Sequence, residues 1–108
     1  MNKITIAFDV DGTLRDNRDG YEYGNPIGAQ PNERIRTLLI TLASFKNTRI
    51  IVWSGGGRDY AEDIVRAFKL EPYVDKCLSK ESGFVPDIAI DDIHECNLGQ
   101  FNLIVREK

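Results

Sequence analysis

Residues 4–13 read ITIAFDVDGT and carry the strongest indication of the fold. An uncharged run, residues 4–8, leads directly into Asp9, and a second acid, Asp11, is followed by Gly12 and Thr13. Continuous runs of this kind are typical of parallel strands that are covered on both faces. A glycine directly after the acids permits a sharp turn. The stretch therefore predicts a buried strand with two carboxylates at its carboxyl end.

Four later segments have the same strand-like character. Residues 49–53, 86–90 and 101–105 are expected to be strands, and residues 76–78 a shorter one. Residues 49–53 are followed by Ser54 and three glycines, and residues 86–90 are followed by a pair of adjacent acids. Runs this short and apolar suit the interior of a parallel sheet.

Two segments between the predicted strands have helical periodicity. Pro31 suits the first turn of a helix, which is expected to end near Asn47. A second helix is expected to begin after Gly57 and to end before Pro72. Their apolar residues, which recur at intervals of three and four, are Ile35, Leu38, Leu39 and Leu42, then Ala61, Ile64, Val65 and Phe68. The alternation predicts one α/β domain over residues 1–108, a Rossmann-like parallel sheet of about five strands flanked by helices.

Polar residues follow three of the predicted strands. The carboxyl ends of parallel strands lie at one edge of the sheet, where ligands bind in open α/β folds. The side chains expected to converge there are Asp9, Asp11, Ser54, Asp91 and Asp92. Clustered carboxylates need a cation or protons, and Mg²⁺ prefers oxygen ligands. A serine followed by glycines at a strand-to-helix junction suits a phosphate group.

Residues 12–30 have no clear periodicity and contain Tyr21 and Tyr23. A long irregular segment that leaves an acidic site is either a flap over that site or a plain surface loop. The tyrosines would then stack on a substrate ring or only pack the segment itself.

Composition excludes several classes of protein. The net charge of −3 argues against non-specific electrostatic binding to nucleic acid or to an anionic membrane. No apolar stretch approaches the roughly 20 residues that span a bilayer, and no signal peptide is visible, so a cytoplasmic location is expected. Cys77 and Cys96 are expected to be reduced and mostly buried, and His94 to be a surface residue.

The order of the motifs is a strand with D-x-D-G-T, a strand with serine, a lysine at Lys80 and a strand with two acids. This order resembles the haloacid-dehalogenase superfamily of phosphohydrolases and phosphotransferases, over residues 4–92. The resemblance implies a Mg²⁺-dependent phosphatase core. Larger members carry an inserted cap domain, but the segments on either side of Ser54 are filled largely by the predicted helices. The chain therefore resembles a minimal member without a cap.

The resemblance also implies roles for individual residues. Asp9 would attack phosphorus and form a phospho-aspartate, and Asp11 would act as general acid and then as general base. Lys80 would stabilise the negative charge, with Lys76 as the competing lysine. The expected metal ligands are Asp9, the Asp11 carbonyl, Asp92 directly and Asp91 through water. The expected substrate-binding residues are Thr13, Ser54, Gly55 and Arg58. Apart from the resemblance, Arg15, Arg18, Arg58 and Lys80 could form a local positive rim, or the arginines could only form a solvated surface.

The expected partner is a phosphorylated substrate, either a small molecule or the end of a nucleic acid, without a membrane. An open site is also compatible with a homo-oligomer in which a neighbouring subunit covers it. Two alternatives remain. A phosphoacceptor domain of the response-regulator type uses a similar acidic pocket, although its motif order differs. A non-catalytic regulatory module on the same fold is the other.

Overall fold

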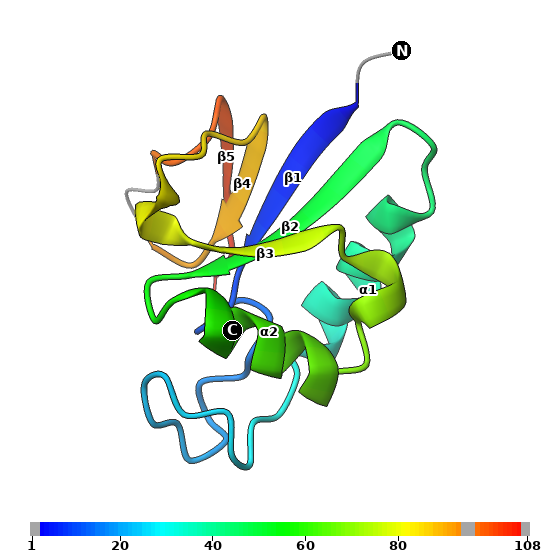
Figure 1. The fold of residues 1–108 in the computed structure, drawn as a ribbon. Coiled ribbons are helices and arrows are strands. Elements are labelled where there is room, and N and C mark those ends of the chain that lie inside the picture. Colours follow the sequence, from blue (N-terminus) through cyan, green and yellow to red (C-terminus); the bar gives the residue numbers. More distant parts are fainter. Residues whose placement is uncertain (1–2, 94–96, 107–108) are drawn as a thin grey trace.

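The computed structural model describes residues 3–93 and 97–106. One five-stranded sheet has the order β3-β2-β1-β4-β5, and every neighbouring pair is parallel. Its strands are β1 (Ile4–Asp9), β2 (Thr48–Ser54), β3 (Lys76–Ser79), β4 (Ile88–Asp91) and β5 (Phe101–Ile104). The predicted α/β, Rossmann-like class is confirmed, and β1 is the central strand (Figure 1).

Two helices connect the first three strands. The helix α1 (Glu33–Ala43) follows β1, and α2 (Arg58–Ala67) follows β2. Both crossovers step in the same direction along the sheet, so a right-handed connection places both helices on one face (Figure 1). Short 3₁₀ turns, η1 (Glu71–Tyr73) and η2 (Lys80–Ser82), flank β3. Between β1 and β3 the described residues form only α1, β2, α2 and η1. None of these elements is an inserted cap domain.

The two faces of the sheet are covered differently. On the helical face, alternate strand residues pack with α1 and α2 into one apolar core, which includes Ile6, Phe8, Ile50, Val52, Leu39 and Ile64. On the other face a smaller cluster of Ala7, Ile51, Trp53 and Ala89 is covered by Phe84 and Leu98 from loops. Trp53 is buried, as its place in the strand predicts.

The start and end of α1 differ from the prediction. Pro31 precedes the helix and forms a bridge with Arg15, whereas Asn32 is the N-cap and accepts hydrogen bonds from the amides of Arg34 and Ile35. Asparagine is a stronger cap than proline because its side-chain oxygen satisfies free helical amides. The helix ends at Ala43 rather than near Asn47, and the Thr48 hydroxyl donates to the freed carbonyl of Leu42 at 2.6 Å.

Within the described part of the chain, neither helix combines the length and the apolar character needed to cross a bilayer.

Candidate active site

Asp9 ends the central strand and lies at the middle of the site. Its side chain is 7% exposed, and Lys80 Nζ lies 2.6 Å from Asp9 Oδ1. The Thr13 hydroxyl donates to Asp9 Oδ2 at 3.1 Å. Both carboxylate oxygens therefore have a polar partner, as a buried charge requires.

Lys80 connects the ends of separate strands. Its Nζ lies 2.6 Å from Asp91 Oδ2, the same distance as from Asp9. The 3₁₀ turn η2 begins at Lys80 because the Ser79 side chain accepts the amide of Glu81 and turns the chain at the end of β3. Lys76 begins the same strand and lies over the Phe84 ring instead, with Nζ 5.6 Å from the ring centre. Of the two candidate lysines, Lys80 is the one that contacts the acids.

The acid pair at the end of β4 completes the cluster. The two oxygens of Asp91 are already bonded, one to Lys80 and the other to the amide of Ile93 at 3.1 Å. Asp92 points toward Gly12, where a Cβ would lie 2.0 Å from its Oδ2. Ligand oxygens of Asp9, Asp91 and Asp92 lie within 4.8 Å of one another. The structure therefore brings Asp9, Asp91 and Asp92 together, as the sequence predicts.

Burial and mutual repulsion shift the pKa values of this cluster. Burial, followed by the nearby charges of Asp91 and Asp92, raises the pKa of Asp9 to about 8 in spite of Lys80. Burial also raises the pKa of Asp92. Burial opposes the charged form of Lys80, but its contacts with Asp9 and Asp91 outweigh this and raise the lysine pKa. One lysine does not neutralise three carboxylates, so the site favours a further cation or a proton.

The donor set fits a magnesium ion. Three carboxylates offer the oxygen ligands that Mg²⁺ prefers. The buried Oδ1 of Asn17 has no hydrogen-bond partner among the described residues, and Asn17 Nδ2 would lie 2.9 Å from a Cβ on Gly12, beside Asp92. A buried acceptor at this place calls for a donor, such as a water on a bound cation. Asp9 and Asp91 each have both oxygens engaged by other groups, so a cation would share these oxygens with Lys80.

Asp11 lies outside the three-carboxylate group and is held by Tyr60. The Tyr60 hydroxyl donates to Asp11 Oδ1 at 2.5 Å and accepts from Arg15 Nη1 at 3.0 Å. Arg15 in turn pairs with Asp19 at 2.9 Å, and both of these side chains are 1% exposed. A partly buried chain of four polar groups thus fixes the orientation of the Asp11 carboxylate.

The prediction that Arg15 belongs to a positive rim is therefore wrong. Arg15 is buried because Asp19 matches its charge and because Tyr60 and the Asn25 carbonyl accept hydrogen bonds from its Nη1. Tyr60 is not among the site residues that the sequence predicts. The available signal was its position one helical turn before Ile64 on the apolar face of α2, since a buried tyrosine hydroxyl needs a partner.

The glycine-rich turn after β2 lies against Tyr60. Ser54 is 2% exposed, and its Oγ accepts the amide of Gly56 at 2.9 Å. A Cβ on Gly56 would lie 3.0 Å from the Tyr60 ring, so the glycine permits this close approach. The α2 N-terminus has no side-chain cap, which leaves amides that suit an anion.

The irregular segment 12–30 lies beside the site. Tyr21 and Tyr23 meet edge to face with ring centres 6.5 Å apart, and a Cβ on Gly55 would lie 2.9 Å from the Tyr23 hydroxyl. Burial, followed by the nearby Asp11, raises the pKa of Tyr21 to about 12. The segment therefore reaches both Asp11 and the glycine-rich turn, which is where a flap would lie.

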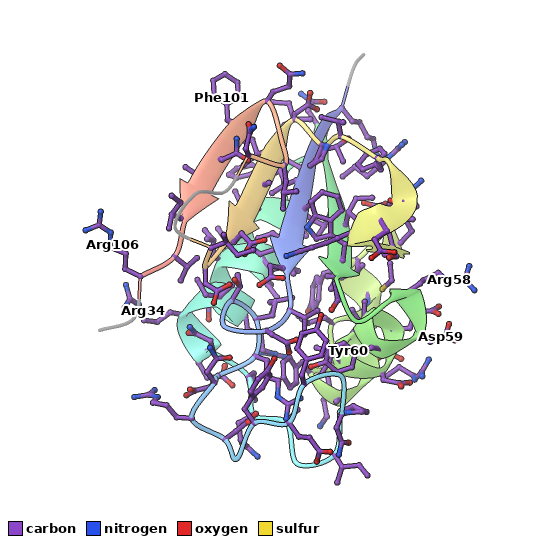
Figure 2. The ribbon with its side chains drawn as sticks, turned by 90° about the vertical axis from the view of Figure 1, so that its left-hand side faces the viewer. Arg34, Arg58, Asp59, Tyr60, Phe101 and Arg106 are labelled. Atoms are coloured by element: carbon purple, nitrogen blue, oxygen red, sulfur yellow. The ribbon has the colours of Figure 1, made fainter. Side chains whose placement is uncertain are left out.

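Several predicted residues are not brought into the cluster. Arg58 projects away from the site, and its nearest carboxylates are those of Glu62 and Asp59 at 3.7 and 3.8 Å (Figure 2). Arg18 bonds Asp16. His94 and Cys96 lie outside the described residues. Cys77 is a free, half-buried thiol whose pKa burial raises to about 11.

Comparisons of the chain with protein-family models, with curated proteins and with solved structures found no match.

Proposed function

We propose that this protein is a Mg²⁺-dependent phosphatase that forms a phospho-aspartate on Asp9. The observation that carries the proposal is the pair of 2.6 Å contacts from Lys80 to Asp9 and Asp91, next to the Asp92 carboxylate. These residues come from three separate motifs, and their order along the chain resembles that of the haloacid-dehalogenase superfamily. Membership in that superfamily is part of the proposal.

The proposed reaction has two steps. An Asp9 carboxylate oxygen attacks phosphorus, the bond from phosphorus to the leaving oxygen breaks, and Asp11 donates a proton to that oxygen. Asp11 then takes a proton from water, which attacks the phosphorus of the phospho-aspartate. This releases inorganic phosphate and restores the Asp9 carboxylate. Bound Mg²⁺ would supply positive charge for the phosphoryl oxygens.

The surrounding residues support these roles. Lys80 acts against the burial that raises the pKa of Asp9, and it offsets the charge that builds up on the phosphoryl group. The Tyr60 hydroxyl holds the Asp11 carboxylate in one orientation, as a residue that moves protons requires. The uncapped start of α2 beside Ser54 offers amides to the phosphoryl oxygens.

The first experiment is release of phosphate from p-nitrophenyl phosphate with Mg²⁺. Many turnovers per molecule are expected, with none in EDTA or in Asp9→Asn. A phosphoacceptor domain of the response-regulator type would be phosphorylated about once per molecule, and a regulatory module would release nothing. The held Asp11 carboxylate favours repeated turnover, because a base for the second step is present. Turnover that persists in Asp9→Asn would contradict the proposed mechanism.

A further inference from the structure

A hollow of about 230 Å³ lies next to the acidic cluster, on the side of β5. Its walls come from the segment after β1, from the start of α1 and from the chain just after β5. They include Gly12, Asn17, Arg18, Arg34, Val105 and Arg106. Gly12 and Asn17 also border Asp92, so the hollow adjoins the candidate metal ligands directly.

The walls of this hollow carry an excess of positive charge. Arg18 bonds Asp16 through two nitrogens at 2.9 and 3.0 Å, and these bonds lower the pKa of Asp16 to about 2. The charge of Arg15 is matched by Asp19. Arg34 and Arg106, in contrast, form no ion pair with any residue in 3–93 or 97–106. Figure 2 shows both projecting from the same side of the molecule.

Backbone hydrogen bonds fix the chain next to Arg34 and Arg106 relative to the acidic site. The amide of Val105 donates to the Asp91 carbonyl at 2.7 Å, which ties the chain before Arg106 to the acid pair. The amide of Asn32 donates to the Leu14 carbonyl at 2.7 Å, which ties the start of α1 to the segment after Asp11. The arginines therefore approach the hollow from elements that are anchored to the acidic site itself.

We propose that this hollow binds a second phosphate group of the substrate, so that the preferred substrate carries two phosphates close together. The inference rests on the proposed phosphatase function, with the first phosphate at Asp9. Arg34 and Arg106 are exposed and carry like charges at the walls of one hollow, which favours an anion there. Guanidinium groups match phosphate oxygens in charge and in planar geometry. The second phosphate belongs either to a small bisphosphate or to the phosphodiester next to the terminal phosphate of an oligonucleotide.

The test compares substrates in the wild type and in the double variant Arg34→Gln/Arg106→Gln. Adenosine 3′,5′-bisphosphate and a 5′-phosphorylated dinucleotide each carry two phosphates, whereas adenosine 3′- and 5′-monophosphate carry one. We expect kcat/KM of the wild type to favour at least one two-phosphate substrate about tenfold or more, the scale of hydrogen bonds to a charged group. In the double variant this preference should fall toward one, mainly through a higher KM.

The matched control is Arg49→Gln. Arg49 is also exposed and forms no ion pair with the residues that the structure describes, but it lies at the opposite end of the sheet, near the start of β2. This variant should keep the substrate preference. Unchanged thermal unfolding of all variants would show that a loss is not due to misfolding.

The outcomes separate the two proposals. A wild type that hydrolyses p-nitrophenyl phosphate but does not prefer two-phosphate substrates overturns the second-phosphate site alone. A preference that survives in the double variant overturns it as well. A preference for only the dinucleotide assigns the second group to a nucleic-acid end, and a preference for the bisphosphate assigns it to a small molecule.

If the wild type hydrolyses nothing, the phosphatase proposal fails. A binding measurement then tests separately whether the hollow is an anion site. Calorimetry then compares the Kd of adenosine 3′,5′-bisphosphate for the wild type, the double variant and Arg49→Gln. Binding weakened about tenfold only in the double variant supports an anion site. No binding, or equal binding in all three, overturns it.

Discussion

The carboxylate of Asp92 occupies the place where a side chain on Gly12 would be. A Cβ at Gly12 would lie 2.0 Å from Asp92 Oδ2, and Gly12 has a φ of +80°. The close approach brings the end of β4 against the turn after β1. The position of a candidate metal ligand thus depends on the absence of a side chain at residue 12.

Replacing Gly12 with alanine should displace Asp92. Gly28→Ala is the matched control, because Gly28 has a similar φ of +75° but nothing within 4 Å of its Cβ position. Both variants should lose about 1–2 kcal/mol of stability from left-handed backbone strain. Only Gly12→Ala should also lose Mg²⁺-dependent phosphate release and the rise in Tm with Mg²⁺. Full Mg²⁺ dependence in Gly12→Ala would contradict the assignment of Asp92.

Tyr60→Phe should lower kcat about tenfold with little change in KM, since one hydrogen bond to a charged group is lost. The hydroxyl is the group that orients Asp11. Tyr73→Phe is the control, because Tyr73 lies on η1 and is 37% exposed. Steady-state kinetics on p-nitrophenyl phosphate provide the measurement. Equal kcat in both variants would remove Tyr60 from the proposed machinery.

In EDTA, stability should fall as the pH rises from 5 to 8. The pKa of Asp9 is raised from 3.8 to about 8 and that of Asp92 is also raised, so the native state binds more protons than the unfolded state over this range. Unfolding then becomes easier as the pH rises. Mg²⁺ replaces the missing protons and should raise the Tm most at pH 8.

Thermal unfolding across this pH range in EDTA and in Mg²⁺ provides the measurement. Asp9→Asn should flatten the profile in EDTA. Asp59→Asn, which removes a carboxylate with a 91% exposed side chain, should not. A Tm that rises with pH in EDTA would show that the acidic cluster is already neutralised.

Cys77 should react slowly with iodoacetamide. Its pKa is raised from 9.0 to about 11 by burial, which lowers its thiolate fraction about a hundredfold at pH 8. The measurement uses Cys96→Ser, so that Cys77 is the remaining thiol, and compares native protein with protein in urea. Native and unfolded rates that agree would contradict the shift.

The central strands and the acid cluster were predictable from the sequence because β1, β2 and β4 are short, largely apolar runs that each end at a polar residue. Once parallel strands were inferred, the convergence of Asp9, Asp91 and Asp92 followed from the shared edge of the sheet. Choosing Lys80 over Lys76 depended on the bounds of β3, since Lys76 begins this strand whereas Lys80 follows its carboxyl end, where the acids lie.

The hydrogen bonds that hold the Asp11 carboxylate, through Tyr60 and Arg15, were not predictable from the sequence. It depends on the path of residues 12–30, where no periodicity indicates that Arg15 turns inward to meet Asp19 and Tyr60. The expected rim position of Arg15 failed for this reason. Pro31 precedes α1 because Asn32 caps the helix, and the projection of Arg58 away from the site depends on side-chain conformation rather than sequence pattern.

The central claim is a covalent phosphoryl group on Asp9, and chemical trapping tests it most directly. Sodium borohydride reduces an acyl-phosphate, so an aspartate that carried the phosphoryl group is converted to homoserine and can be located by mass spectrometry of peptides. With p-nitrophenyl phosphate and Mg²⁺ we predict homoserine at residue 9, and none when EDTA is present. Steady turnover with no conversion at residue 9, or conversion at Asp11 instead, would contradict the account.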